Sequence, residues 1–306
     1  MKKLILMASL ALAPALFAET FAAGSQAAPW LKLPNSARSA AMGEAVVAVG
    51  GDVNSISVNP AGLASLKGYE ASLLHHAYVQ DTSIEHLAFG MGMGDMGGAA
   101  LSVDYLNFGP VDRYTVDPTT NSLQAAGSFT PSGMAVNAGY GKAIGPISAG
   151  INLKMVSQSL DGSSSSSAFG ADFGAFWRQD PKEGLALGLA AQNFGSQLDG
   201  ASLPGNFKLG AAYMLGLREG ADDLLFAADV NAPTADTGAS TVSLGAEYAG
   251  GSLYAVRGGY KIAGNGGAGG FSAGAGLKYS IAAIDYAFVN QGVLGNSNEV
   301  SLTFKF

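Results

Sequence analysis

The sequence contains no cysteine among its 306 residues. This absence excludes disulfides, thiolate metal sites, cysteine nucleophiles and a lipid anchor on an N-terminal cysteine. Charged residues are scarce as well, because they make up 13% of the chain against a usual share of roughly 25%. With only 16 lysines and arginines, the chain lacks an electrostatic surface for nucleic acid and a polybasic patch for anionic lipid. We therefore expect no nucleic-acid partner.

Long apolar runs are absent after the first 18 residues. Residues 1–18 have the form of a secretory signal peptide, in which Lys2 and Lys3 precede an apolar stretch and then small residues. We predict cleavage after Ala18 or Ala22, which removes both lysines and changes the formal net charge from −7 to −9. No later run approaches the roughly 20 apolar residues of a spanning helix. A membrane location for the rest of the chain therefore requires a closed β-barrel.

Glycine, by contrast, is abundant, with 44 residues, which is about twice its usual share. Because glycine costs about 1 kcal/mol relative to alanine inside a helix, its spread along the chain favours strands, turns and close backbone contacts. Disorder is disfavoured, since 48% of the residues are apolar.

From residue 69 onward the sequence repeats segments of about ten residues with period-2 hydrophobicity. In residues 147–156, for example, Ile151, Leu153 and Met155 alternate with polar Asn152 and Lys154, as in a strand with one apolar face. Fourteen segments follow this pattern: 69–78, 84–93, 98–108, 133–142, 146–158, 168–178, 184–194, 206–216, 222–231, 240–249, 252–262, 270–280, 282–290 and 297–306.

The even number of segments and the alternation of short and long connections predict an all-β fold, a transmembrane antiparallel β-barrel of about 14 strands. A soluble β-sandwich also alternates, but it does not need aromatic residues near strand ends on the apolar face. Such residues occur here at Tyr140, Trp177, Tyr213, Tyr248, Tyr260 and Tyr279. We therefore favour the barrel, spanning residues 69–306.

The opposite face of these segments carries a mixed set of charges, which we place in the lumen. The set comprises Asp104, Lys154, Asp172, Lys208, Asp229, Glu247, Arg257, Lys278, Asp285 and Glu299. Four positive and six negative charges suggest internal ion pairing, although merely solvated polar residues are an equal alternative. Between them the inward residues are mostly Gly, Ala and Ser, which in a barrel of this width leaves space for another segment.

Residues 24–68 lack the barrel pattern and are the expected occupant, an N-terminal luminal plug. The stretch Ser36 to Val49 contains Arg38 and Glu44 and is compatible with a short helix. The stretch Asn59-Pro60-Ala61-Gly62 reads as a capped turn. Asn59 suits a helix N-cap and Pro60 the first helical position, while Gly62 would end the turn or allow close approach to the barrel wall.

With its surroundings, this turn resembles the N-terminus of the PorV/PorQ family, a branch of the FadL-like outer-membrane proteins. The resemblance rests on residues 29–34 (PWLKLP), 37–45 (ARSAAMGEA), 52–55 (DVNS) and 59–63 (NPAGL), and on a final strand that ends in phenylalanine. It implies an outer-membrane location in a Gram-negative-type bacterium, with outer-membrane lipid as a partner.

The resemblance leaves two functions open. FadL-like proteins place an N-terminal hatch in the lumen and pass hydrophobic molecules, often through a side opening. The PorV branch is instead linked to type IX secretion, where it shuttles or holds exported cargo proteins. The motif at residues 59–62 does not assign the branch, and we favour the transporter reading because that motif is shared with transporter-like members.

The last segment has an apolar face that includes Phe304 and Phe306. It resembles the terminal signal read by barrel-assembly machinery, which we therefore expect as a partner. The final strand must also pair with the first strand so that no open edge remains.

Catalytic, metal and cofactor sites are not expected. His75 and His76 are adjacent in a strand and so face opposite ways, which disfavours a shared metal ion. His76, His86 and Asp104 could serve a hydrolase, but no nucleophile spacing supports one. Two matches to the dinucleotide glycine pattern, beginning at Gly92 and Gly264, lie between strands and read as turns.

Overall fold

The computed structural model describes residues 26–306, except 163, 181–182, 219–220, 235–238 and 265–268. The expected signal peptide and both expected cleavage sites lie outside the described residues. No helix in the described part of the chain is long and apolar enough to cross a membrane.

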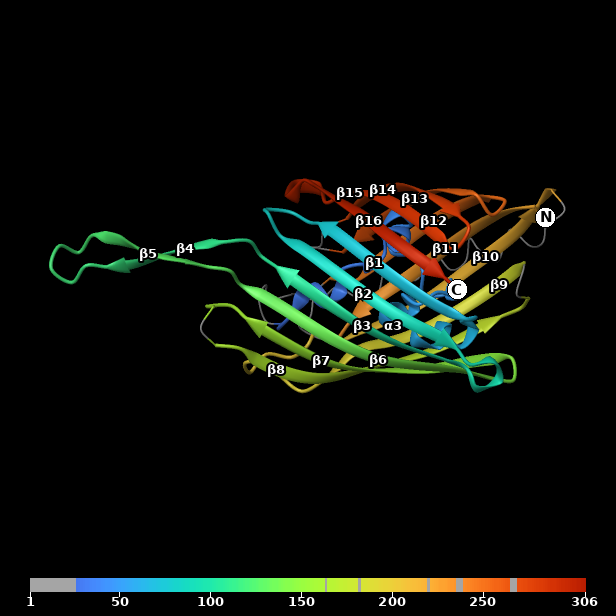
Figure 1. Cartoon of the computed structure of the whole chain (residues 1–306), viewed down its shortest axis with the longest axis horizontal. Helices are drawn as coiled ribbons and strands as arrows, with labels where there is room; N and C mark the ends of the chain where they lie inside the picture. Colours follow the sequence, from blue (N-terminus) through green and yellow to red (C-terminus); the bar gives the residue numbers. More distant parts are fainter. Residues whose placement is uncertain (1–25, 163, 181–182, 219–220, 235–238, 265–268) are drawn as a thin grey trace.

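Fourteen antiparallel strands close into a barrel, which confirms the predicted fold class (Figure 1). Each strand pairs with its sequence neighbour, apart from the β3–β6 pair, and β1 pairs with β16 to close the sheet. The barrel strands are β1 (Tyr69–Ala77), β2 (Ser83–Gly92), β3 (Gly98–Asn107), β6 (Ser132–Ile144), β7 (Ile147–Ser159), β8 (Ser166–Arg178), β9 (Gly184–Gly195), β10 (Asn206–Leu217), β11 (Asp222–Pro233), β12 (Thr241–Gly250), β13 (Tyr254–Ala263), β14 (Gly270–Tyr279), β15 (Ala282–Asn290) and β16 (Asn296–Lys305).

Every predicted segment corresponds to a barrel strand, with ends that differ by a few residues. The apolar side chains of the alternating pattern face outward and stay exposed, as expected for a surface in contact with lipid. Large exposed examples along the wall are Leu73, Leu87, Leu101, Leu153, Leu189, Leu209, Leu244 and Ile284.

The long connection between β3 and β6 has a structure of its own. It contains a two-stranded sheet of β4 (Val111–Val116) and β5 (Leu123–Phe129) that projects from the end of the barrel opposite the C-terminus (Figure 1). At its base, the Arg113 guanidinium donates to the carbonyl of Asp161 at 2.5 Å and lies over the Phe129 ring. The residues of this hairpin do not alternate between apolar and polar as those of a barrel strand do, so the sequence does not predict it.

Within the described residues, four short helical elements precede the barrel: η2 (Pro29–Lys32), α2 (Ala37–Ala41), α3 (Ser55–Val58) and η3 (Pro60–Ser65). The Ser36 side chain caps α2 by accepting from the Ser39 amide. The helix ends early because Gly43 and Glu44 both adopt positive φ angles of 62° and 67°. The helix expected between Ser36 and Val49 is thus limited to five residues.

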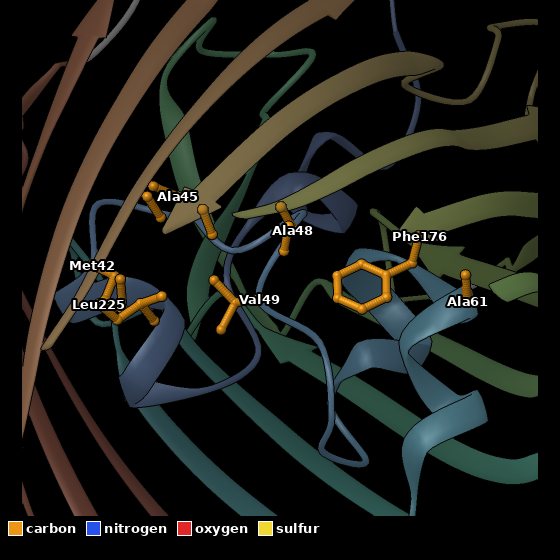
Figure 2. Close-up of a cluster of buried hydrophobic side chains, with 10 residues drawn as sticks. Met42, Ala45, Ala48, Val49, Ala61, Phe176 and Leu225 are labelled. Atoms are coloured by element: carbon orange, nitrogen blue, oxygen red, sulfur yellow. The ribbon is translucent and has the colours of Figure 1, made fainter. Parts of the chain in front are cut away.

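Side chains of residues 26–66 pack against buried side chains of the barrel strands. One buried cluster joins Met42, Ala45, Ala48, Val49 and Ala61 of this segment to wall residues such as Phe176 and Leu225 (Figure 2). A second joins Val53, Ile56, Leu63 and Leu66 to Ala88 and Ala100. The small inward residues of the strands therefore make room for a folded segment.

Candidate functional site

The candidate site is the contact between the N-terminal segment (residues 26–68) and the inner wall. Five inward glycines pair in register across β2, β3, β6, β7 and β8. We call this set the glycine row: Gly92, Gly98, Gly141, Gly150 and Gly174. A Cβ at any of these positions would meet η3 or the residues flanking it; at Gly141, for example, it would stand 2.6 Å from the Pro60 carbonyl oxygen. The row lets the backbone of this helix touch the backbone of the wall.

The opposite wall accepts residues 41–49 in the same way. A Cβ on Gly245 would lie 2.6 Å from the Met42 carbonyl oxygen, and its register partner Gly259 lies against the backbone at Met42 and Gly43. Between these two sides, Gly188 of β9, the strand next to β8, faces the Val47 carbonyl. The glycine excess of the sequence thus places the N-terminal segment close to the wall on two sides of the lumen.

Asn59 connects three parts of this contact. Its Oδ1 accepts from the Ala61 amide at 3.2 Å and caps η3, in which Pro60 takes the first position, as the sequence predicts. Its Nδ2 donates to the Val47 carbonyl at 2.9 Å and to the Ala175 carbonyl of β8 at 3.1 Å. Asn59 is buried, so one side chain holds helix, loop and wall together.

Gly62 differs from its expected role. The helix η3 continues past it to Ser65, so Gly62 does not end the turn. A Cβ at Gly62 would meet Oγ of Ser55 at 2.7 Å and Cα of Gly50 at 3.1 Å. Gly62 therefore permits close contact within the N-terminal segment. Other residues of η3, such as Pro60 and Leu63, face the wall.

Arg38 joins the N-terminal segment to a chain of charges on the wall. Its Nε and one terminal nitrogen donate to the two carboxylate oxygens of Glu247 at 2.8 and 2.7 Å. Arg257 donates to the same Glu247 carboxylate at 2.5 Å and to Asp285 at 2.5 Å, while Asp52 lies 3.6 Å from Arg38. The adjacent Glu247 charge raises the pKa of Arg38 above its ordinary value. This arrangement is the internal ion pairing that the sequence suggested.

Two other wall charges hold the N-terminal segment. Lys261 of β13 donates to Glu44 at 2.5 Å. Asp229 of β11 accepts from the Val47 amide at 2.8 Å. Lys208 faces the same lumen and lines a small cavity beneath η2 together with Glu44. Glu44, like Arg38, thus contacts the wall as a charged tether.

Asp172 organises a polar cluster within the wall itself. It accepts from Asn152 at 2.8 Å, from Lys154 at 2.8 Å and from the Asn193 amide at 2.7 Å. Asn193 has a φ of 60° and lies where the register between β8 and β9 shifts. The buried carboxylate therefore stabilises a β-bulge.

The remaining lumen charges include histidine pairs. His86 lies 2.6 Å from Asp104. His76 lies 3.5 Å from its register partner Glu299, and the side chains of His76 and Glu299 are fully buried. No group of three or more potential His, Asp or Glu metal ligands occurs in the described part of the chain.

Lys278 does not join these luminal contacts. Its place in the alternating pattern is inward, but the residue is exposed, because β14 ends one residue later at Tyr279. Its side chain therefore stands at the rim of the barrel.

The lumen is polar at the end of the barrel that carries the chain's C-terminus. A cavity of about 180 Å³ there is lined by Ser36, Arg38, Asp52, Asn54, Glu70, Glu247, Arg257, Asp285 and Lys305, among others. We call it the charged vestibule. Sequence reasoning missed Asp52 and Glu70 as charges of this cavity because neither belongs to the midsection of a strand.

Comparison with solved structures gives outer-membrane barrels. The toluene transporter TbuX of Ralstonia pickettii matches with a TM-score of 0.57 and 13% identity over 89% of this chain and 98% of the transporter. The toluene transporter TodX of Pseudomonas putida matches with a TM-score of 0.56 and 12% identity, over 88% and 96%. A FadL homologue of Pseudomonas aeruginosa matches with a TM-score of 0.57 and 12% identity, over 89% and 98%. These likenesses show a shared fold.

Comparison with curated proteins gives no match. A family model described as uncharacterised protein family UPF0164 matches residues 10–248. That match does not confirm the PorV/PorQ branch, which stays a prediction. Since the matched region covers most of the sequence, the chain belongs to the UPF0164 family.

Proposed function

We propose that this protein is an outer-membrane barrel of a Gram-negative-type bacterium that passes small hydrophobic molecules, with the N-terminal segment as its gate. The observation that carries the proposal is the seating of η3 on the glycine row, held by Asn59. The segment is held by hydrogen bonds, ion pairs and packing, which can be exchanged for a second arrangement.

The fold supports the same proposal. The solved structures with this architecture include two described as toluene transporters. The exposed apolar side chains of the wall fit a surface that contacts lipid. A barrel occupied by its own N-terminal segment needs movement of that segment before a solute can pass.

A reversible tether tests the gate directly. The Cγ2 atom of Val53 lies 2.8 Å from the position of a Cβ on Gly90, so Val53→Cys with Gly90→Cys brings two sulfurs within bonding range. The chain has no other cysteine to interfere. We expect toluene uptake by vesicles or cells to stop when the pair is oxidised and to return on reduction. Each single cysteine variant is the control.

Uptake that is identical in the oxidised and reduced double variant contradicts the gate. A second measurement uses planar bilayers, in which the intact protein should stay nearly closed. Deleting residues 26–66 should give a large, stable conductance, because the barrel of fourteen strands then has an unobstructed lumen.

The alternative function is a type IX secretion-linked barrel that shuttles or anchors exported cargo proteins. The β4–β5 hairpin favours it, because β4 and most of β5 are exposed and carry the apolar side chains Tyr114, Val116 and Leu123. Replacing residues 110–130 with a short turn distinguishes the two functions. Loss of cargo secretion with normal toluene uptake supports the alternative. Normal cargo secretion with loss of toluene uptake supports the transporter.

A further inference from the structure

Trp30 occupies an apolar site at the end of the lumen from which the β4–β5 hairpin projects. Its indole is buried in η2 and lies against Gly133 of β6, where a Cβ would stand 2.9 Å from three of the ring atoms. Around it is a cluster that we call the mouth cluster: Ile84, Leu106, Ala135, Val156 and Ala168 of the wall, with Leu198 and Leu203 of the β9–β10 connection. These strand residues lie near the ends of β2, β3, β6, β7 and β8 that are farthest from the chain's C-terminus.

The indole is not well matched to this site in one respect. Its Nε1–H is shielded from solvent and has no hydrogen-bond acceptor among the described residues. A buried donor without an acceptor destabilises the closed arrangement, whereas an apolar ring of similar shape would lose nothing there. The site therefore fits a hydrocarbon ring better than it fits the indole that fills it.

The two ends of the lumen also differ in polarity. The charged vestibule at the C-terminal end is lined by four acidic and three basic side chains. An apolar molecule gains little there, since those charges would lose solvent or each other. Of these two regions, only the mouth cluster offers the contacts that an apolar ligand needs.

We propose that the mouth cluster is a binding site for a planar apolar ring, an aromatic hydrocarbon, and that Trp30 is an internal stand-in which the ligand displaces. The link between this displacement and gating rests on the proposed function. Displacing Trp30 moves η2, which connects through residues 33–36 to α2 and the Arg38–Glu247 contact. Ligand binding at the mouth thereby biases the position of the gate.

The experiment uses tryptophan fluorescence, because the chain contains only two tryptophans. Trp177→Phe leaves Trp30 as the sole reporter, and toluene is titrated into the purified protein in detergent. We expect a saturable red shift of the Trp30 emission as the indole moves into water. Trp30→Phe is the matched control, since Trp177 lies at the opposite end of β8 from Ala168 of the mouth cluster and reports only solvent effects of toluene in the micelle.

An unchanged Trp30 emission, or the same non-saturable change in both variants, overturns the proposal. A second variant, Trp30→Ala, removes the stand-in and should bind toluene at least several-fold more tightly than the parent. Adding Gly133→Leu to it fills the slot and should abolish that gain. Equal affinity of the parent and Trp30→Ala contradicts the stand-in role.

The tether experiment separates this proposal from the proposed function. If the Val53–Gly90 tether reversibly controls toluene uptake but the Trp30 emission does not respond to toluene, the gate is supported and the mouth site is rejected. A saturable Trp30 response without any uptake keeps the mouth site and rejects transport.

Discussion

A Cβ atom on Gly174 would overlap the Oδ1 atom of Asn59. Gly174 belongs to the wall strand β8, whereas Asn59 caps η3 inside the lumen. The absence of a side chain at one residue thus permits the hydrogen bonds of the other, and neither role is visible without the contact between them.

Gly174→Ala should therefore loosen the N-terminal segment. Overpacking of a tight contact costs roughly 1–3 kcal/mol, and we expect that loss in the free energy of unfolding together with a higher open probability in planar bilayers. Gly258→Ala is the control, because a Cβ there would meet nothing within 4 Å. Equal behaviour of the two variants would mean that η3 does not rest on the glycine row.

Glu247→Gln should strongly destabilise the barrel. The substitution leaves the Arg38 and Arg257 guanidinium groups facing a neutral amide, and removing one partner of a buried ion pair costs roughly 3–5 kcal/mol. Urea unfolding in lipid vesicles measures the effect. As the control, Glu85→Gln alters the contact with His75, in which both side chains are exposed, and a change below about 1 kcal/mol is expected.

The lipid-facing assignment predicts a contrast between two leucines of nearly equal exposure. Leu153 of β7 is 57% exposed on the wall, and Leu160 is 56% exposed in the connection that follows. Leu153→Lys should cost about 2–4 kcal/mol near the bilayer midplane, whereas Leu160→Lys should be nearly neutral. Comparable losses in vesicle-based unfolding would contradict the membrane placement of the wall.

Phe306 should matter for assembly, as the sequence predicts. The structure shows two contributions that the residue could make, its aromatic ring and its backbone pairing with the first strand. The Phe306 amide donates to the Tyr69 carbonyl at 2.8 Å and the Tyr69 amide to the Phe306 carbonyl at 3.2 Å, which joins the ends of the first and last strands. Deleting Phe306 removes both the ring and this pairing, and should lower the amount of heat-modifiable, membrane-inserted protein.

Phe306→Ala retains the backbone pairing and removes only the ring. If barrel-assembly machinery reads the ring, this variant should insert as poorly as the deletion at native expression levels. Normal insertion of Phe306→Ala would assign the effect of the deletion to strand pairing alone.

Much of the barrel can be predicted from the sequence because each strand is marked by a pattern in its own residues. Alternation of apolar and polar residues fixes which side chains face lipid, and turn residues mark where each strand stops, so every barrel strand could be located. The same locality explains the miss at residues 111–129. A hairpin exposed to solvent needs no apolar alternation, so nothing in its pattern distinguishes it from a loop.

The sequence by itself determined the period of the strands, the small residues of the inner face and the residues that cap η3. Only the tertiary structure decided that Gly92, Gly98, Gly141, Gly150 and Gly174 stand in one row, that Arg38 shares Glu247 with Arg257, and that Gly62 faces Ser55 rather than the wall. The physical reason is register. A strand carries the positions of its own side chains, but their height relative to a neighbouring strand, and what they meet across the lumen, is set when the barrel closes.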